Sequence, residues 1–303
     1  MTIVRGGIGP DLVVAGAARS GTTQLTARLG MHPSVDPCVV KEPNYFSREY
    51  DRGQDWYDSY FAPREGGLAR LDASVSYTFP QFPQALDRLA AASPDAYVVY
   101  VVREPLARAV SHYHLNKFYF GHEKAADFGA AVRSGSPYLD VSDYERWLGK
   151  LHTTFADDRV LVVPFQSVAS RGQEVADVVF RGLGLSPFDD VDEGELSAHR
   201  HNVVTFRGQA SRRLTRTLRH SRAYPAVRRA LGAHTVKRIR SLVTAPVPDM
   251  PSVADELRSC DARQRRDLEQ LRERAEASVA SHLAGQDARL GLDWSGDWPS
   301  APR

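Results

Sequence analysis

The sequence predicts an α/β fold in which a central parallel sheet carries helices on both faces. Short apolar runs alternate along the chain with segments of helical periodicity, as βαβ units require. The run Ala96–Val102 is apolar throughout, which is typical of a central parallel strand with both faces buried. A glycine-containing segment, Gly16–Gly21, follows another apolar run and precedes a helical pattern. These observations favour a strand–loop–helix unit like that of P-loop proteins.

The first two-thirds of the chain supply most of the predicted elements. We expect a strand at Asp11–Ala17 and a helix from Thr22 to Gly30, where the glycine ends it. Leu71–Tyr77 predicts a second strand, although polar residues interrupt it. After the strand Ala96–Val102, a helix begins at Pro105, because proline suits the first helical turn.

The remaining elements complete this core and then change in character. Arg159–Pro164 predicts a buried strand and Glu174–Leu183 a helix. Residues 196–248 contain eleven Arg, one Lys and no acidic residue, so this segment carries +12 in a chain of net charge +2. Apolar residues at helical spacing predict short basic helices there, followed by one charged helix over Ala254–Leu283. We therefore expect a single domain, 1–303, with an α/β core over 11–195, a basic helical segment over 196–248, and a charged helix and tail over 249–303.

Composition excludes several classes of protein. The 303 residues are 42% hydrophobic and 25% charged, as in ordinary globular domains, and no apolar stretch approaches the ~20 residues of a membrane helix. Cys38 and Cys260 are too few for a disulfide framework or a thiolate zinc site. The first ten residues lack the pattern of a signal peptide. We expect a cytoplasmic protein without a metal.

The segment Gly16-x-x-x-x-Gly21-Thr22-Thr23 has the spacing of a loop that binds phosphate through backbone N–H groups and a helix N-terminus. Position 22 is Thr, where a nucleoside triphosphatase has the Lys that reaches the β- and γ-phosphates. The strongest strand leads into Arg103 rather than into an Asp that would hold Mg²⁺. The pattern suits a nucleotide with two separated anionic groups. The alternative is that the glycines only form a turn.

Three segments occur in order: Arg-Ser-Gly-Thr-Thr at 19–23, Lys-Glu-Pro-Asn-Tyr-Phe at 41–46, and Val-Arg-Glu-Pro-Leu-Ala-Arg-Ala-Val-Ser-His-Tyr at 102–113. Together they resemble the sulfotransferases that use 3′-phosphoadenosine 5′-phosphosulfate (PAPS), nearest to the heparan-sulfate-like branch and its bacterial relatives. Residues 140–148 and 160–165 are similar to a later helix and strand of that family. The resemblance covers residues 11–185 and implies PAPS as co-substrate, with no metal.

The resemblance also implies roles for single residues. Arg103 and Ser111 would bind the 3′-phosphate, and Arg207 with Gly208 is similar to a segment that closes over the nucleotide. We interpret Arg108 as a residue on the helix surface, the alternative being a support for Arg103. The residues that would hold the 5′-phosphosulfate are Arg19, Ser20, Gly21, Thr22 and Thr23.

Glu42 is the expected catalytic base, because it aligns with the base of the heparan-type segment, and Lys41 would lie beside the sulfonate. A carboxylate can take the proton of an acceptor hydroxyl. Asn44 stands where that family has His. The alternative is a structural Glu–Lys pair at the surface. His32, His112 and His114 compete for the role of base, but we interpret all three as mainly structural.

Asp72, Ser74 and Tyr77 are expected to line the acceptor cleft. The hypothesis is a sulfotransferase that acts on a hydroxyl of a carbohydrate or small natural product. One alternative is a P-loop kinase, and another is a non-enzymatic binder that acts through residues 196–248. This basic segment suits peripheral contact with a membrane, and its scarcity of aromatic residues argues against nucleic acid. The acceptor and the oligomeric state are beyond the sequence.

Overall fold

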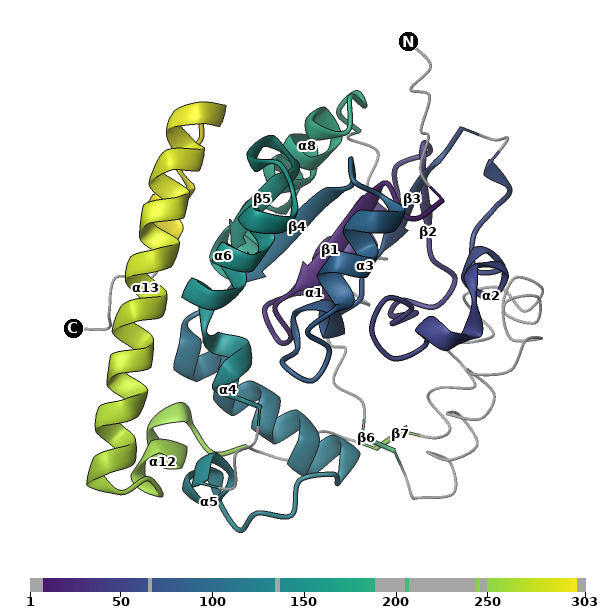
Figure 1. Ribbon diagram of the computed structural model, residues 1–303. Coiled ribbons are helices and arrows are strands. Elements are labelled where there is room, and N and C mark those ends of the chain that lie inside the picture. The colour runs from purple at the N-terminus through teal and green to yellow at the C-terminus, as the bar shows by residue number, and fades with distance from the viewer. Residues whose placement is uncertain are drawn as a thin grey trace.

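A five-stranded parallel sheet lies at the centre of the protein, with its strands in the order β2-β3-β1-β4-β5 (Figure 1). The structure is a computed structural model that describes residues 8–64, 67–133, 137–188, 205–206, 244–245 and 250–298. The strands are β1 (Leu12–Gly16), β2 (Val35–Pro37), β3 (Ala69–Asp72), β4 (Tyr97–Val102) and β5 (Val160–Pro164).

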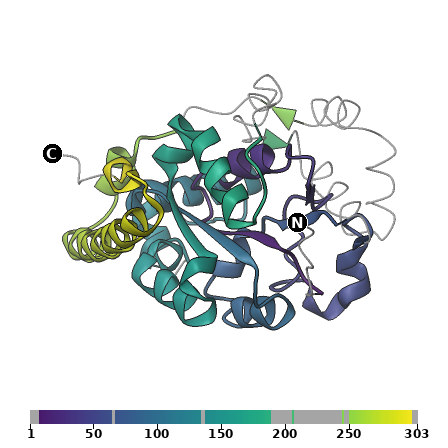
Figure 2. The ribbon, with the colours of Figure 1, turned by 90° about the horizontal axis from the view of Figure 1, so that it is seen from above.

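Helices cover both faces of this sheet, which confirms the predicted fold class (Figure 2). The helices are α1 (Thr22–Leu29), α2 (Gln54–Asp58), α3 (Ala85–Ala92), α4 (Pro105–His114), α5 (Phe128–Arg133), α6 (Tyr144–Thr154), α7 (Phe165–Ser170), α8 (Gly172–Gly182), α12 (Val253–Arg258) and α13 (Ala262–Leu290). The 3₁₀-helices are η1 (Tyr50–Arg52), η3 (Val75–Thr78), η5 (Asp140–Ser142), η6 (Asp157–Arg159) and η7 (Trp294–Asp297), and η4 (Leu115–Phe120) is a π-helix. A two-stranded antiparallel pair consists of β6 (Thr205–Phe206) and β7 (Thr244–Ala245).

Strand β4 shows why the central run is apolar without interruption. Successive side chains of a strand point to opposite faces. Val98 and Tyr100 belong to the cluster that α3, α6 and α13 form on one face, and Val99 belongs to the cluster of α1 and α8 on the other. All three are fully buried. Both faces of β4 therefore require hydrophobic residues, as expected of a parallel sheet between two helical layers.

The C-terminal part of the chain differs from the single helix expected over Ala254–Leu283. The structure has two helices, α12 and α13, with a break after Ser259. Asp261 accepts a hydrogen bond from the Gln264 N–H at 2.8 Å, and its own N–H donates to Gln264 Oε1 at 2.9 Å. This reciprocal capping box starts a new helix, and helical periodicity alone does not locate such a break.

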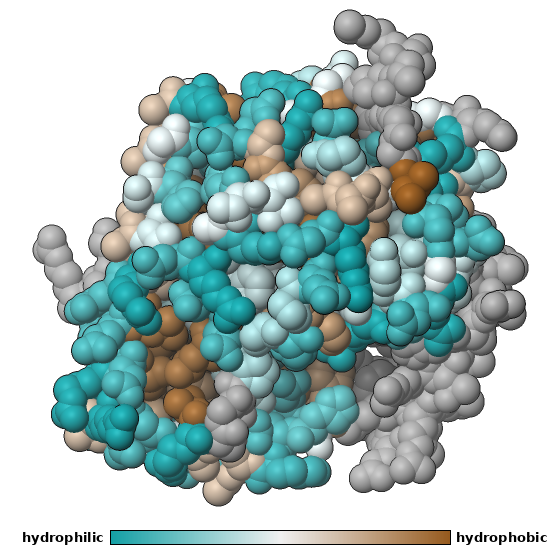
Figure 3. Space-filling view, viewed as in Figure 1, coloured by the Kyte–Doolittle hydropathy of each residue, from teal (hydrophilic) through white to brown (hydrophobic). Residues whose placement is uncertain are grey.

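These C-terminal helices also enclose a hydrophobic cluster of their own. It includes residues of α4, α5 and α13, and hydrophobic side chains gather between α13 and α4 on the face drawn in Figure 3. The long helix α13 contacts α6 as well, so it lies along one side of the sheet domain (Figure 1). Ala275, Val279 and Leu283 of α13 also belong to the cluster on one face of the sheet, so α13 is part of the core of the sheet domain.

The strand predicted at Leu71–Tyr77 is wrong from Ala73 onward. β3 ends at Asp72, and the chain turns into η3 because the Asp72 side chain bonds back to Ser74 and Tyr77. The short strand β2 was not predicted. No described helix is both long enough and apolar enough to span a bilayer. Apart from β6 and β7, the basic segment 196–248 lies outside the described residues.

Candidate active site

The loop between β1 and α1 has the geometry of an anion-binding turn at the carboxyl end of the sheet. Gly21 has a φ of 85°, and a Cβ there would lie 2.8 Å from a ring carbon of Phe165, so only glycine fits. The Ala17 N–H donates to the Val101 carbonyl at 2.8 Å, which joins the loop to β4. No side chain caps the N-terminus of α1, and its first turn has no acidic residue. The partial positive charge of this helix start therefore remains for an anion.

Two arginines meet beside this loop. Arg103 Nη1 donates to the Arg19 carbonyl at 3.2 Å, and Arg19 has a φ of 72°, which is uncommon for a non-glycine residue. Burial lowers the pKa of the Arg19 guanidinium and the charge of Arg103 lowers it further, while burial also lowers the pKa of Arg103. Within the described part of the chain, neither arginine forms an ion pair with a carboxylate. Two partly buried cations without a described counter-ion are suited to an anionic ligand.

Ser111, which the resemblance assigns to the 3′-phosphate, lies in the same group. Arg19 Nε donates to Ser111 Oγ at 3.1 Å, so the two predicted halves of the nucleotide site are adjacent. Tyr144 fixes the backbone of Arg103, since its hydroxyl accepts from the Arg103 N–H at 3.2 Å and donates to the Arg103 carbonyl at 2.7 Å. No pattern in the sequence indicated this role of Tyr144, which lies 41 residues away from Arg103.

Arg108 is not the surface residue that we expected. It is fully buried and donates to the Ala18 carbonyl at 3.1 Å and to Ser142 Oγ at 2.6 Å, with a further bond to the Tyr138 carbonyl. Burial lowers the pKa of its guanidinium to about 10. The helical position of Arg108 points inward, and its planar fork joins α4 to the phosphate loop and to η5. Arg108 thus supports the phosphate loop from inside the core.

Lys41 and Glu42 are both half-exposed, with the Lys41 Nζ 2.9 Å from Glu42 Oε1. Glu42 is close enough to Arg19 that its charge raises the pKa of that guanidinium. The Glu42 carbonyl accepts a hydrogen bond from Asn44 Nδ2 at 2.8 Å. Segments that lie far apart in the sequence thus bring the expected base close to the phosphate loop.

The three residues expected to line the acceptor cleft are instead buried. Asp72, Ser74 and Tyr77 each have no exposed surface. Ser74 Oγ and the Tyr77 hydroxyl donate to the Asp72 carboxylate at 2.7 Å each. These three polar groups satisfy one another inside the core, so they do not face a cleft in this structure.

The histidines lie in structural surroundings. His32 Nδ1 accepts the Ser34 N–H at 2.9 Å, and His114 Nε2 lies 2.7 Å from Glu256 Oε1 on α12. Burial and the charge of Arg108 hold the pKa of His112 well below its usual value. Arg207 and Gly208 lie outside the described residues. In the part of the chain that the structure describes, no three His, Cys, Asp or Glu side chains form a group that could hold a metal.

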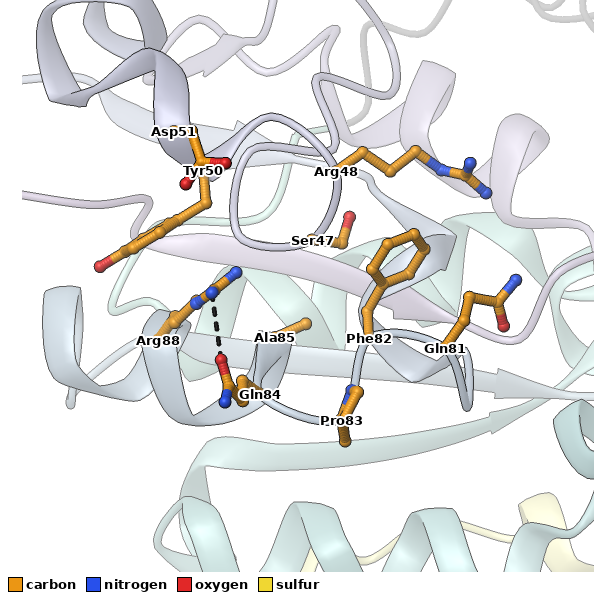
Figure 4. Close-up of a pocket in the computed structure, with 10 residues that line it drawn as sticks. All are labelled: Ser47, Arg48, Tyr50, Asp51, Gln81, Phe82, Pro83, Gln84, Ala85 and Arg88. Carbon is orange, nitrogen blue, oxygen red and sulfur yellow. Dashed lines mark hydrogen bonds between the residues drawn. The ribbon is translucent and has the colours of Figure 1, made fainter.

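A hollow of about 250 Å³ lies between residues 47–51 and residues 81–88 (Figure 4). The Arg88 guanidinium lies over the Tyr50 ring, 4.1 Å from its centroid, and that of Arg48 lies 4.9 Å from the centroid of Phe82. Arg88 also donates to Gln84 Oε1 at 3.1 Å, the dashed line in Figure 4. The lining residues come from residues 47–51, from the segment before α3 and from α3 itself: Ser47, Arg48, Tyr50, Asp51, Gln81, Phe82, Pro83, Gln84, Ala85 and Arg88.

Residues 9–209, two-thirds of the chain, match the family described as sulfotransferase domain. The chain belongs to the sulfotransferase domain family. This confirms the resemblance that the three motifs indicated. The matched region includes the phosphate loop, the Lys41–Glu42 segment and the Arg103–Ser111 pair.

The names of two curated relatives of this sulfotransferase-family chain refer to a glycan, heparan sulfate. A mouse (Mus musculus) heparan sulfate glucosamine 3-O-sulfotransferase 6 is 35% identical over 104 residues, 34% of this chain and 30% of the relative. A human (Homo sapiens) bifunctional heparan sulfate N-deacetylase/N-sulfotransferase 3 is 26% identical over 61% of this chain and 23% of the relative. The match thus spans less than a third of the length of these relatives.

A solved sulfotransferase from Alicyclobacillus acidocaldarius has the same fold. It superposes with a TM-score of 0.55 at 21% identity and covers 95% of this chain and 98% of that chain. At this identity the similarity extends to the fold alone.

The residues at the site fit the co-substrate of the family, PAPS. A ligand with a 5′-phosphosulfate and a 3′-phosphate requires cationic and N–H donors at two neighbouring positions. Arg19 and the uncapped start of α1 supply one set, and Arg103 with Ser111 supplies the other. The chemistry of the donors therefore matches the anions.

Proposed function

We propose that this protein transfers a sulfuryl group from PAPS to a hydroxyl group of a carbohydrate or a small natural product. The observation that carries the proposal is the pair Arg19–Arg103, two neighbouring guanidinium groups at an uncapped helix N-terminus without a described carboxylate partner. When bound, PAPS supplies a sulfuryl group that is attached to a good leaving group, its 5′-phosphate.

The two arginines have different tasks in this proposal. The loop residues 19–23 bind the 5′-phosphosulfate, and Arg103 with Ser111 binds the 3′-phosphate. Arg19 stabilises the negative charge that builds up on the departing phosphate, because a preorganised cation in a partly buried site lowers that barrier. A guanidinium keeps its proton at all relevant pH values, so Arg19 acts through charge and hydrogen bonds.

Glu42 takes the proton of the acceptor hydroxyl as the new sulfur–oxygen bond forms and the bond to phosphate breaks. Lys41 lies 2.9 Å from Glu42 and supplies positive charge next to the sulfonate. The half-exposed position of Glu42 gives an acceptor access to its carboxylate. This assignment follows the family resemblance and the proximity of Glu42 to Arg19.

We infer that the acceptor reaches Glu42 from the side of the hollow in Figure 4. Ser47, which lines the hollow, is five residues after Glu42 in the chain. Arg88, which also lines it, donates from Nη1 to the Phe46 carbonyl at 3.4 Å and so joins α3 to the segment 41–46. Aromatic faces beside guanidinium and amide groups suit a sugar ring with polar substituents. The glycan in the names of the relatives, heparan sulfate, is therefore the first acceptor to test.

Thermal unfolding with adenosine 3′,5′-bisphosphate and, in parallel, with ATP and Mg²⁺ tests the nucleotide site. A ligand at ~100 times its dissociation constant adds ~2.7 kcal/mol of stability, enough to raise Tm by several degrees. We expect a rise with the bisphosphate that EDTA does not change. A rise with Mg-ATP alone would replace this proposal with the P-loop kinase.

Transfer of label from [³⁵S]PAPS to heparan sulfate, and to p-nitrophenol as a small hydroxyl acceptor, then tests the reaction. Label in either acceptor supports the proposal. Nucleotide binding without transfer to any hydroxyl acceptor contradicts it and favours a binding protein. The basic segment 196–248, its contact with a membrane surface, a cytoplasmic location and a bacterial origin stay predictions from the sequence.

A further inference from the structure

A buried carboxylate lies close behind the segment that carries Glu42. Asp72, the last residue of β3, has no exposed surface, and no cation pairs with it in the described part of the chain. Three hydroxyl groups donate to it instead: Tyr57 at 2.9 Å and Tyr77 at 2.7 Å to Oδ2, and Ser74 at 2.7 Å to Oδ1. A buried carboxylate is costly, so three buried donors around one carboxylate require an explanation.

One of these donors leads directly to the proposed base. Ser74 Oγ gives its only proton to Asp72, so its lone pairs are free to accept, and it accepts the Asn44 N–H at 3.0 Å. Asn44 Nδ2 then donates to the Glu42 carbonyl at 2.8 Å. Asp72 is thus connected to Glu42 through two residues and three hydrogen bonds.

Asn44 also needs this support because of its backbone. Its φ is 55°, in the left-handed region that non-glycine residues seldom occupy. Its Oδ1 accepts a bond from Ser76 Oγ, and Ser76 Oγ lies 2.6 Å from Ser47 Oγ. A strained backbone at a site persists only where the surroundings hold it.

We propose that Asp72 is a positioning residue, which orients the Ser74 hydroxyl toward Asn44 and thereby holds Glu42 in place beside Arg19. The inference rests on the proposed function, in which Glu42 is the base. Asp72 itself touches neither co-substrate nor acceptor, since it is fully buried. Its effect on the reaction passes through the backbone of residues 42–44.

The test compares Ser74→Ala with a matched control, Tyr57→Phe. Each variant removes one hydroxyl that donates to Asp72 from a fully buried side chain, but only Ser74 also contacts Asn44. Hydrogen exchange of a peptide that covers residues 41–47 reports on the loop without any assay of activity. The rate of transfer from [³⁵S]PAPS to heparan sulfate or p-nitrophenol reports on Glu42.

For Ser74→Ala we expect at least tenfold faster exchange in the 41–47 peptide. We also expect kcat to fall by roughly tenfold or more, because a small displacement of a catalytic group lowers the reaction rate strongly. Its Tm rise with adenosine 3′,5′-bisphosphate stays as in the wild type. Tyr57→Phe keeps exchange in this peptide and kcat within about twofold. Equal effects of the two variants on exchange would overturn the proposal, because they would indicate a structural role alone.

Asn44→Gly provides a second route that spares the buried core. Glycine adopts a φ of 55° readily and keeps the N–H that bonds to Ser74, and it removes the two side-chain bonds, to the Glu42 carbonyl and from Ser76 Oγ. We expect kcat to fall while Tm stays near that of the wild type, and unchanged kcat with unchanged exchange would overturn the proposal. Faster exchange in Ser74→Ala with normal kcat would instead uphold the positioning of the loop and overturn the role of Glu42 in the proposed function.

Discussion

The site is built differently around Arg19 and Arg103 than around Glu42. On the nucleotide side, two guanidinium groups lie together without a described carboxylate partner, and burial lowers both pKa values. On the side of Glu42, the charge is paired with Lys41, and hydrogen bonds that lead from Asp72 through Ser74 and Asn44 hold the backbone. The comparison teaches that an anion site keeps charge unpaired for its ligand, whereas a general base needs a fixed position. Variants on the two sides should therefore fail in different ways.

The largest expected effect is on stability and comes from the buried support of the nucleotide side. Arg108→Ala removes the donors of two carbonyls and of Ser142 and leaves a cavity, so we expect a loss of roughly 3–5 kcal/mol. Urea unfolding measures this loss. Arg146→Ala, at an exposed position on α6, is the control and should change stability by less than about 0.5 kcal/mol. A change for Arg108→Ala as small as the control's would mean that the loop does not depend on this side chain.

The next prediction concerns the pH dependence of stability, and it tests the buried carboxylate of Asp72. Burial raises the pKa of Asp72 from 3.8 to about 6, so the folded protein holds this proton more tightly than the unfolded chain. The corresponding stability is present below pH 3.8 and is lost as pH rises through 6, by about 3 kcal/mol in all. The stability of the wild type relative to Asp72→Asn should therefore decrease between pH 4 and pH 7 in urea unfolding. A difference that grows with pH would contradict the raised pKa.

Glu42→Gln tests the catalytic side by itself. Loss of the general base should lower kcat by about 100-fold or more, equivalent to about 2.7 kcal/mol, because the amide cannot take the proton of the acceptor. The Tm rise with adenosine 3′,5′-bisphosphate should remain, since the arginines are untouched. Glu49→Gln, on the same loop, is the matched control and should keep kcat within about twofold. Normal turnover in Glu42→Gln would contradict the assignment of Glu42 as the general base.

Arg103→Ala should produce the opposite pattern. We expect weaker binding of adenosine 3′,5′-bisphosphate by roughly 10–30-fold, about 1.5–2 kcal/mol, since charge-assisted hydrogen bonds to a phosphate are lost. Isothermal titration calorimetry measures this affinity. Stability without ligand should not fall much, because the variant also relieves the repulsion between Arg19 and Arg103. Unchanged affinity would exclude a 3′-phosphate site at this position.

The smallest effect belongs to the hollow in Figure 4. Arg88→Ala should raise the KM for heparan sulfate by about three- to fivefold and leave the affinity for the bisphosphate as it is. Arg258→Ala, an exposed arginine on α12, controls for the loss of one positive charge. Equal KM values for the two variants would place the acceptor elsewhere.

The sequence by itself determined the strands at the centre of the sheet and the loop that follows the first of them. Ala96–Val102 is apolar throughout because both faces of β4 are buried, and local composition is enough to predict that. The loop 16–23 is a continuous segment whose glycines and N–H groups act locally, so its residues could be read in order. Arg103 was predictable for the same reason, because it directly follows the strand that positions it.

Only the tertiary structure decided the roles of Arg108, Asp72 and Tyr144. Arg108 occupies a helical position that sequence periodicity allows on either face, and its burial depends on carbonyls of residues 18 and 138. Asp72 resembled a residue of an open cleft, but the hydroxyl of Tyr57, 15 residues earlier, joins Ser74 and Tyr77 in enclosing it. Hydrogen bonds between distant segments leave no pattern in a single sequence, because a donor and its acceptor meet only after the chain has folded.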